Sequence, residues 1–132
     1  MAINYQNIGF AKEAKGLLDD ALKEYQISLA YNNDIDSEMG RVICFNSIGK
    51  VYIKQKKYEE ALQILEDALR KALTLGDQYY IATSYTNLGW LQSLTGQELL
   101  AEQNLKKAIR ISDNFNLLSS KIEALQYLSD NY

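Results

Sequence analysis

The sequence contains no proline and no histidine, and Cys44 is its one cysteine in 132 residues. Without histidine there is no Ser-His-Asp or Cys-His nucleophile, no imidazole general base, and no histidine ligand for zinc or iron. A single cysteine excludes an intrachain disulfide and a thiolate metal cluster, and it is typical of a reduced, cytoplasmic protein. The sequence therefore predicts no catalytic residues, no metal and no cofactor.

Long apolar runs and an excess of positive charge are missing as well. No stretch approaches the roughly 18 apolar residues that span a membrane, and the N-terminal residues lack a basic region followed by an apolar run. We therefore expect neither a membrane-spanning nor an exported chain. Acidic residues outnumber basic ones, 17 to 14. This balance argues against a nucleic-acid partner, with one local exception in the lysines Lys50, Lys54, Lys56 and Lys57.

What the sequence does have is an internal repeat with an offset of 40 residues. Three glycines recur at this offset, and so do three alanines: Gly9, Gly49 and Gly89; Ala21, Ala61 and Ala101. Larger side chains recur with them: Ile8, Ile48 and Leu88; Tyr25, Leu65 and Leu105. Small positions stay small and large positions stay large, which indicates three copies of one structural unit.

Each unit has the apolar spacing of two helices, most clearly in the second unit at Phe45, Ile48, Tyr52, Ala61, Leu62, Leu65, Ala68, Leu69 and Ala72. The breaks within units fall at Gly16, at 55–57 and at Gly96. Those between units fall at 32–34, 76–77 and 113–114. The pattern predicts helices near 2–15, 18–31, 38–55, 58–75, 78–95, 98–113 and 117–131.

The repeated glycines lie inside the first helix of each unit, where glycine costs about 1 kcal/mol relative to alanine. We therefore expect a close helix crossing at each glycine. The repeated alanine and the large side chain one turn later on the second helix would be its partners. Cys44 aligns with Asn4 and Ser84 of the other units, and we expect a half-buried structural thiol there.

The second unit carries a motif made by Phe45, Ile48, Gly49, Tyr52, Ala61, Leu65 and Ala68. This motif resembles the tetratricopeptide repeat (TPR). The first unit departs from it at Lys12 and the third at Gln92. The usual repeat has about 34 residues and ends in proline, whereas this one spans 40 and has none.

The resemblance implies an all-α fold, a right-handed superhelical solenoid of antiparallel helix pairs. It places a single domain over 1–132, with repeats at about 2–37, 38–77 and 78–116 and a terminal helix at 117–131. Forty-residue versions resemble the sensor and scaffold domains of bacterial regulators. This implies a signalling or regulatory module of a larger bacterial protein.

The terminal helix continues the apolar spacing through Ile122, Leu125 and Leu128, but Ser129 replaces the glycine. It is either a capping helix with a polar outer face or part of a fragment cut from a longer protein. We favour the fragment, because the N-terminus also enters a repeat directly. An uncovered apolar edge on this helix would make the chain a self-association module, forming a homodimer.

The resemblance also implies that the first helices line a concave surface. Ligand contacts would come from set positions around the glycine, here Gln6, Phe10, Asn46, Lys50, Lys54, Thr86 and Trp90. The residues give partial support, because Asn46, Lys50 and Lys54 form a stripe at four-residue spacing apart from the packing face.

We expect this surface to bind a protein or peptide segment, such as an acidic one, without catalysis. Lys50 and Lys54 would hold carboxylates, Asn46 would bond an extended backbone, and Trp90 would be the anchor. The alternatives are that the lysines are ordinary solvated charges and that Phe10 and Trp90 pack between repeats. Capture of a chaperone C-terminus is not expected, because the corresponding clamp positions hold Gln6, Phe10, Ser47, Thr83 and Asn87.

Overall fold

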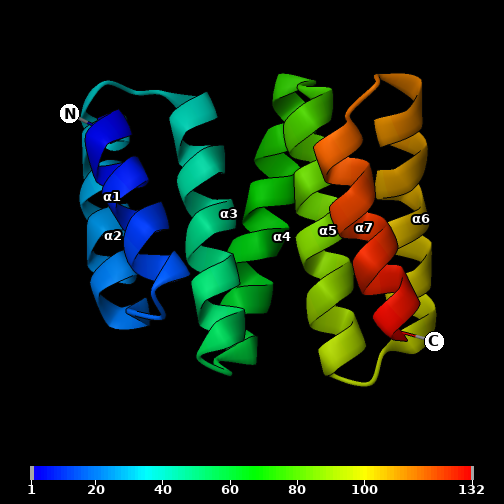
Figure 1. Cartoon of the computed structure of the whole chain (residues 1–132). Coiled ribbons are helices and arrows are strands. Elements are labelled where there is room, and N and C mark those ends of the chain that lie inside the picture. The colour runs from blue at the N-terminus through cyan, green and yellow to red at the C-terminus, as the bar shows by residue number, and fades with distance from the viewer. Residues whose placement is uncertain (1, 132) are drawn as a thin grey trace.

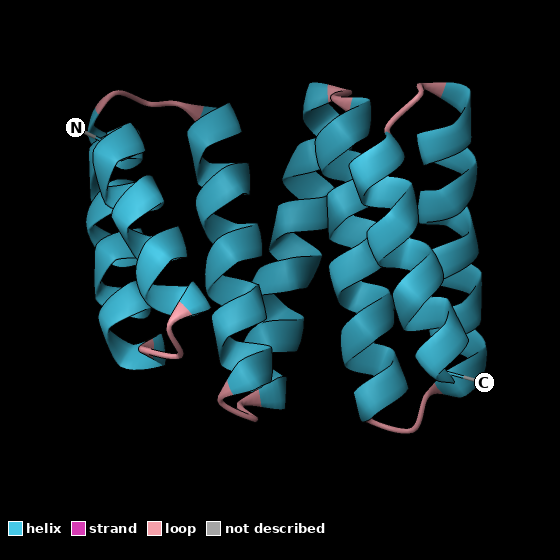
Figure 2. Cartoon of the chain, in the orientation of Figure 1, coloured by secondary structure: helices cyan, strands magenta, loops and turns pink. Residues whose placement is uncertain are grey.

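The computed structural model describes residues 2–131, and over this range the chain forms seven α-helices joined by short turns (Figures 1 and 2). The helices are α1 (Ala2–Ala14), α2 (Leu18–Asp34), α3 (Glu38–Lys54), α4 (Tyr58–Leu75), α5 (Gln78–Leu94), α6 (Glu98–Asn114) and α7 (Leu118–Asn131). No strand occurs within these residues. The predicted all-α class is confirmed.

The helices are arranged as successive antiparallel pairs (Figure 1). The pairs α1–α2, α3–α4 and α5–α6 follow one another along the molecule, and α7 lies against α5 and α6 at the end opposite to α1. The first helix of each pair and α7 run in the same direction, and the second helices run back. The predicted solenoid of helix pairs is therefore confirmed.

The six turns share one backbone device. A residue with positive φ follows each of the first six helices, at intervals of 20 residues. Three of these residues are glycines, and the other three are Asp36, Lys56 and Asn116, with φ of 53°, 63° and 56°. Asp and Asn tolerate this left-handed conformation, whereas Lys56 is strained in it. The turn at Lys56 thus keeps the repeat geometry without the glycine found at position 96.

Two helices extend beyond their predicted ends. The sequence predicts that the helix ends before the run Asn32-Asn33-Asp34, but α2 continues to Asp34. The reason is that the buried Asn32 donates its side-chain amide to the Ser28 carbonyl of its own helix, at 2.9 Å. Its hydrogen-bonding capacity is thereby used inside the helix. Similarly, α6 continues through the predicted break at 113–114 to Asn114.

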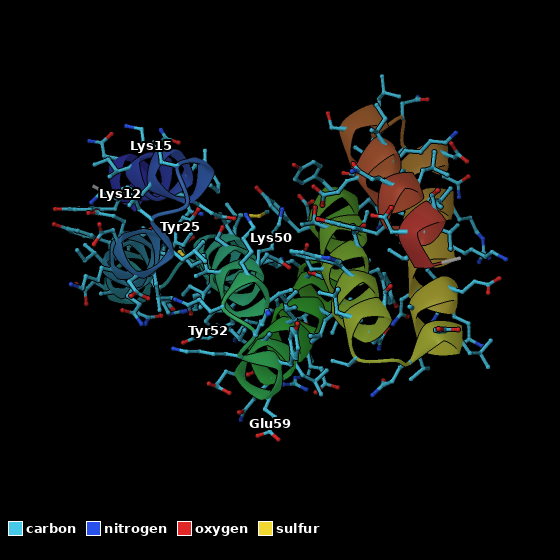
Figure 3. The ribbon with its side chains drawn as sticks, turned by 60° about the horizontal axis from the view of Figure 1, so that its bottom comes forward. Lys12, Lys15, Tyr25, Lys50, Tyr52 and Glu59 are labelled. Carbon is cyan, nitrogen blue, oxygen red and sulfur yellow. The ribbon has the colours of Figure 1, made fainter. Side chains whose placement is uncertain are left out.

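Each helix pair is closed by a crossing at the repeated glycine. A Cβ at Gly9 would lie 2.4 Å from Tyr25, one at Gly49 would lie 2.4 Å from Leu65, and one at Gly89 would lie 2.6 Å from Leu105. Figure 3 shows Tyr25 reaching from α2 to α1. The alanines at the preceding turn, Ala21, Ala61 and Ala101, are fully buried. Larger side chains at the glycines would push the paired helices apart.

The buried apolar side chains form a row of clusters along the stack. One cluster joins α2 to α3 through Ala21, Tyr25, Ile48 and Val51, and another joins α4 to α5 around Leu65, Leu88 and Leu91. Each repeat therefore buries its core against its neighbour, as expected for a solenoid. The first helices keep their opposite face free to form a common surface.

Candidate binding groove

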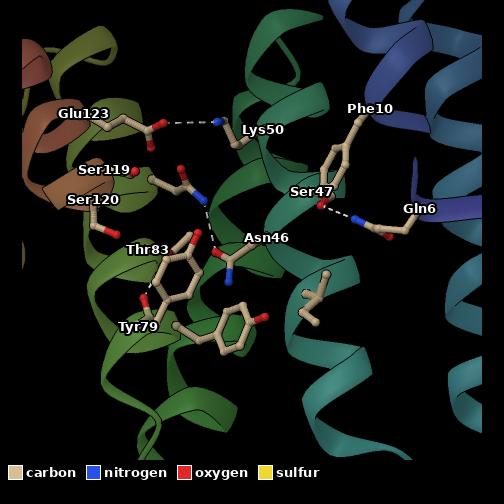
Figure 4. Close-up of a pocket in the computed structure, with 13 residues that line it drawn as sticks. Gln6, Phe10, Asn46, Ser47, Lys50, Tyr79, Thr83, Ser119, Ser120 and Glu123 are labelled. Atoms are coloured by element: carbon tan, nitrogen blue, oxygen red, sulfur yellow. Dashed lines mark hydrogen bonds and ion pairs between the residues drawn. The ribbon is translucent and has the colours of Figure 1, made fainter. Parts of the chain in front are cut away.

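A cavity of about 440 Å³ opens between α1, α3, α5 and α7 (Figure 4). Its lining side chains come from the first helices and from α7: Gln6, Phe10, Ile43, Asn46, Ser47, Lys50, Tyr79, Tyr80, Thr83, Asn87, Ser119, Ser120 and Glu123. A smaller depression of about 240 Å³ adjoins it and shares Phe10, Ser47 and Lys50 with it. Lys54 lines this second depression. The two spaces form one groove, which we call the first-helix groove.

A buried polar triad joins the first repeat to the second beneath this groove. Gln6 Nε2 donates to Ser47 Oγ at 2.6 Å, and Cys44 Sγ lies 3.7 Å from Gln6 Oε1. All three side chains are buried. Because their polar atoms bond one another, α1 is fixed against α3 in a single register.

The same triad recurs 40 residues later between the second repeat and the third. Asn46 Nδ2 donates to Ser84 Oγ at 3.1 Å, and Asn87 Nδ2 donates to Asn46 Oδ1 at 3.0 Å. The members Asn46, Ser84 and Asn87 occupy the repeat positions of Gln6, Cys44 and Ser47. The side-chain types differ, but the arrangement of the triad is kept.

The second triad leaves one acceptor without a partner. Asn87 is fully buried, and its Oδ1 atom makes no hydrogen bond. Asn46 Oδ1 accepts from Asn87 Nδ2, so the amide is oriented with its oxygen left over. Asn87 also lines the cavity. An unsatisfied buried polar group costs about 1–3 kcal/mol, so this atom is an unfavourable feature of the second triad.

The two lysines of the predicted stripe are paired within the protein. Lys50 Nζ on α3 lies 3.7 Å from Glu123 Oε2 on α7, across the opening of the cavity (Figure 4). Figure 3 shows Lys50 on the α3 surface. Lys54 Nζ lies 2.5 Å from Glu13 Oε2 of the preceding repeat. The groove thus presents ion pairs rather than a row of free cations.

Glu13 is held at a second point by a tyrosine hydroxyl. Tyr25 donates its hydroxyl to Glu13 Oε1 at 2.7 Å. Burial raises the pKa of Tyr25 far above its usual value, and the nearby Glu13 carboxylate raises that pKa further. The hydroxyl therefore stays protonated and keeps the carboxylate in place beside Lys54.

The structure brings four of the seven predicted contact residues to the cavity. Gln6 and Asn46 are buried and belong to the triads, whereas Phe10 is half exposed and Lys50 is partly exposed. Lys54 lines the adjoining depression.

The other two predicted residues lie outside the cavity. Thr86 is buried and donates its hydroxyl to the Ala82 carbonyl of its own helix, at 2.9 Å. The Trp90 indole stacks on the Tyr127 ring of α7, with centroids 4.9 Å apart and planes at 9°. This is the packing role that the sequence offered as the alternative for Trp90.

Several lining residues were missed by sequence reasoning. Tyr79, Tyr80, Ser119 and Ser120 lie in the first turns of α5 and α7, and Glu123 lies one turn further. The repeat register contained the signal, because positions 79 and 119, 80 and 120, and 43, 83 and 123 are related by the same 40-residue offset. The sequence prediction used only positions around the glycine and gave α7 no part in the groove.

Cys44 is fully buried rather than half buried as predicted, because it lies between Ser28, Asn32 and Gln6 at the first triad. Burial raises the pKa of its thiol, which disfavours the reactive thiolate. Among the described residues there is no group of three or more acidic or cysteine side chains placed to hold a metal. Within the same range, no helix is long and apolar enough to cross a membrane.

Comparison with known proteins gives one consistent family. A family model described as "Tetratricopeptide repeat" matches residues 1–73 and 41–114. The human protein "Tetratricopeptide repeat protein 21A" is 31% identical over 67 residues, which is 51% of this chain and 5% of that protein. The chain therefore spans only a small part of that relative's length.

A solved structure is similar to nearly the whole chain. It is the C-terminal TPR-containing domain of a Plasmodium falciparum protein assigned as FK506-binding. The match has a TM-score of 0.65 at 17% sequence identity and covers 98% of this chain and 89% of that domain. At this identity the match supports the fold and not a shared ligand.

Proposed function

The chain belongs to the tetratricopeptide repeat family, and we propose that it binds an extended protein or peptide segment in the first-helix groove. Members of this family and fold are typically non-catalytic interaction scaffolds. We assign the same role to this chain, as a signalling or regulatory module of a larger cytoplasmic protein of bacterial type. The 40-residue repeat supports that last assignment by resemblance.

The observation that carries the proposal is the unpartnered acceptor buried beside the cavity. Asn87 Oδ1 is buried and lacks a donor, and Asn46 holds the amide in its orientation. The main-chain N–H of an extended peptide is a donor of suitable size that every sequence supplies. The atom is closed to solvent, so a peptide donor would reach it only after the side chains around it shift, and the new hydrogen bond would then offset the existing penalty.

The groove would select acidic residues through Lys50. Its ion pair with Glu123 is long at 3.7 Å, and the two side chains are 29% and 40% exposed. Such a pair is worth at most about 1 kcal/mol, so a ligand carboxylate can replace Glu123 at low cost. Lys54 would serve a second acidic residue less readily, because Glu13 is the more buried partner. The exposed rings of Phe10 and Tyr79 would cover apolar side chains of the ligand.

A peptide array followed by titration tests this assignment. The array would present extended peptides with paired acidic and amide versions of each sequence, and the strongest binder would be titrated by fluorescence anisotropy. We expect the acidic versions to bind better. Lys50→Glu and Asn87→Leu should each weaken binding by about tenfold or more.

The matched control is Lys106→Glu, since Lys106 lies on α6 away from the groove and pairs with Glu102. It should leave affinity within about twofold. Equal losses in the control and the groove variants, or unchanged binding in Lys50→Glu and Asn87→Leu, would contradict the groove assignment.

A second function, self-association, is favoured by the outer face of α7. Leu118, Ile122 and Leu125 are 69%, 56% and 44% exposed on this helix. Exposed apolar side chains grouped on one face are typical of a protein contact. We propose that this face mediates homodimerisation independently of the groove.

A further inference from the structure

The two glutamates that pair with the groove lysines differ in how firmly they are held. Glu13 Oε2 lies 2.5 Å from Lys54 Nζ, and Glu13 Oε1 accepts the Tyr25 hydroxyl at 2.7 Å. The Glu13 side chain is only 11% exposed. Glu123 Oε2 lies 3.7 Å from Lys50 Nζ, and the Glu123 side chain is 40% exposed. Glu13 is therefore anchored through both oxygens, whereas the Lys50–Glu123 pair is loose and open to solvent.

The Lys50–Glu123 contact is an ion pair without a hydrogen bond. Hydrogen bonds from nitrogen to oxygen have donor–acceptor distances of about 2.7–3.2 Å, and the 3.7 Å between Lys50 Nζ and Glu123 Oε2 is longer. A charge-assisted hydrogen bond to a carboxylate is about twice as strong as one between neutral groups. A second carboxylate at normal distance would therefore gain from Lys50 an interaction that Glu123 does not make.

Glu123 brings a charge to a repeat position that is uncharged in the two preceding first helices. Ile43 of α3 and Thr83 of α5 occupy the equivalent positions, and all three side chains line the cavity. Figure 4 shows the Glu123 carboxylate directed across the opening towards Lys50. The last helix thus places a negative charge where the groove offers its cation.

The helix that carries Glu123 is fixed on the third repeat. Ala124 is fully buried, and the Tyr127 ring stacks on Trp90 with centroids 4.9 Å apart. The Glu123 side chain itself is partly exposed and lies at the edge of the cavity. It can therefore turn from Lys50 into solvent without movement of α7.

We infer that Glu123 is an internal competitor for Lys50, whose carboxylate occupies the place that an acidic residue of the ligand takes. This inference rests on the peptide binding proposed above and adds the residue that limits its selectivity. A ligand without a carboxylate leaves the ion pair intact. An acidic ligand must displace Glu123 and then lie near its negative charge. Glu123 therefore weakens acidic ligands selectively, and a carboxylate overcomes it only by approaching Lys50 more closely.

Glu123→Gln tests the competition, because it removes the charge and keeps nearly the same size. The probes are the strongest acidic peptide of the array and its amide version, titrated by fluorescence anisotropy. We expect Glu123→Gln to raise the affinity for the acidic peptide about three- to fivefold and to change that for the amide version by less than about 1.5-fold. Glu123→Asp shortens the side chain and should give an intermediate gain.

A double-mutant cycle with Lys50→Met separates competition at Lys50 from a general effect of charge. In the Lys50→Met background, Glu123→Gln should leave the affinity for the acidic peptide unchanged. The matched control is Glu66→Gln, which removes the same charge from an exposed position on α4 outside the groove lining. It should change affinity by less than about 1.5-fold. The midpoint of urea denaturation should be the same in Glu123→Gln and the wild type, so that a gain in affinity reports on the site and not on the fold.

The outcomes separate this inference from the proposed function. If Lys50→Met weakens the acidic peptide but Glu123→Gln leaves its affinity unchanged or lowers it, peptide binding stands and the competitor role is overturned. An equal gain in Glu66→Gln, or a gain that persists without Lys50, would show a general charge effect and would also overturn it. If no acidic peptide binds in the groove, the proposed function and the inference both fall.

Discussion

The interfaces between complete repeats differ in kind from the interface that holds α7. Between the first and second repeats and between the second and third, the seam contains a buried triad of hydrogen-bonding side chains. At the corresponding positions of the last seam the residues are Thr86, Ala124 and Tyr127. There the triad is replaced by an aromatic stack between Tyr127 and Trp90.

This difference shows that equivalent repeat positions can hold neighbouring repeats together in two ways. The polar seams orient amide groups beneath the groove and leave Asn87 Oδ1 without a hydrogen-bond partner. The aromatic seam has no such acceptor to present, because Thr86 bonds its own helix and Ala124 is apolar. It holds the last helix by ring contact and burial instead. The repeat register alone therefore does not decide whether neighbouring repeats are joined by buried polar side chains or by stacked rings.

Removal of the stack should have the largest effect. Trp90→Ala deletes the ring that packs on Tyr127, and we expect it to lower the free energy of unfolding by about 3 kcal/mol in urea denaturation. Trp90→Phe keeps an aromatic ring and should lose under about 1.5 kcal/mol. Ligand binding in the groove should survive in both variants. If Trp90→Ala abolished binding without loss of stability, Trp90 would belong to the recognition surface after all.

A matched pair of substitutions at one repeat position gives the next largest effect. Asn46→Val leaves Ser84 and Asn87 without a partner in the buried seam, and we expect a loss of about 2 kcal/mol in the free energy of unfolding. Thr86→Val, 40 residues later, removes a hydroxyl that bonds only its own helix, and it should change stability by under about 0.5 kcal/mol. Similar losses in the two variants would show that the polar seam depends on its hydrogen-bonding side chains no more than the aromatic seam does.

Much of the fold could be predicted from the sequence, because the three repeats can be aligned with one another. The offset placed Gly9, Gly49 and Gly89 at equivalent positions, and a helix-interior glycine repeated three times has few explanations other than a close crossing. The C-terminal ends of α2 and α6 were harder to predict. Whether α2 continues past Asn32 depends on whether the Asn32 amide bonds solvent or its own helix. The packing of the next repeat determines which of the two it bonds.

The groove residues could be predicted only in part, because side chains at equivalent repeat positions need not make equivalent contacts. Positions 6 and 46 do reach the cavity, yet position 86 holds a threonine that is satisfied locally. Trp90 stacks on Tyr127 instead of lining the cavity, and this contact can be predicted only once the position of α7 is known. The ion pairs of Lys50 and Lys54 join residues 73 and 41 positions apart, so the stripe looks unpaired within its own helix.

The last prediction concerns the pH dependence of the aromatic seam, an effect that is absent near neutral pH. Burial raises the pKa of Tyr127 to about 12, and the carboxylates of Glu123, Asp130 and Glu13 add to the shift. The pKa in the unfolded chain is near the ordinary tyrosine value of 10.0. Because the folded-state pKa is the higher one, the stabilising contribution is fully present below pH 10 and is lost as the pH rises towards about 12.

Tyr127→Phe removes this titration while keeping the ring on Trp90. We therefore expect the stability difference between the wild type and Tyr127→Phe to be constant up to pH 10 and then to shift in favour of the variant as the pH rises. The measurement is urea denaturation at a series of pH values, followed by Trp90 fluorescence, with Tyr5→Phe in the first repeat as the control. A parallel pH dependence in all three proteins would mean that Tyr127 titrates as a solvated phenol, and the last seam would then be less tightly packed than the two polar seams.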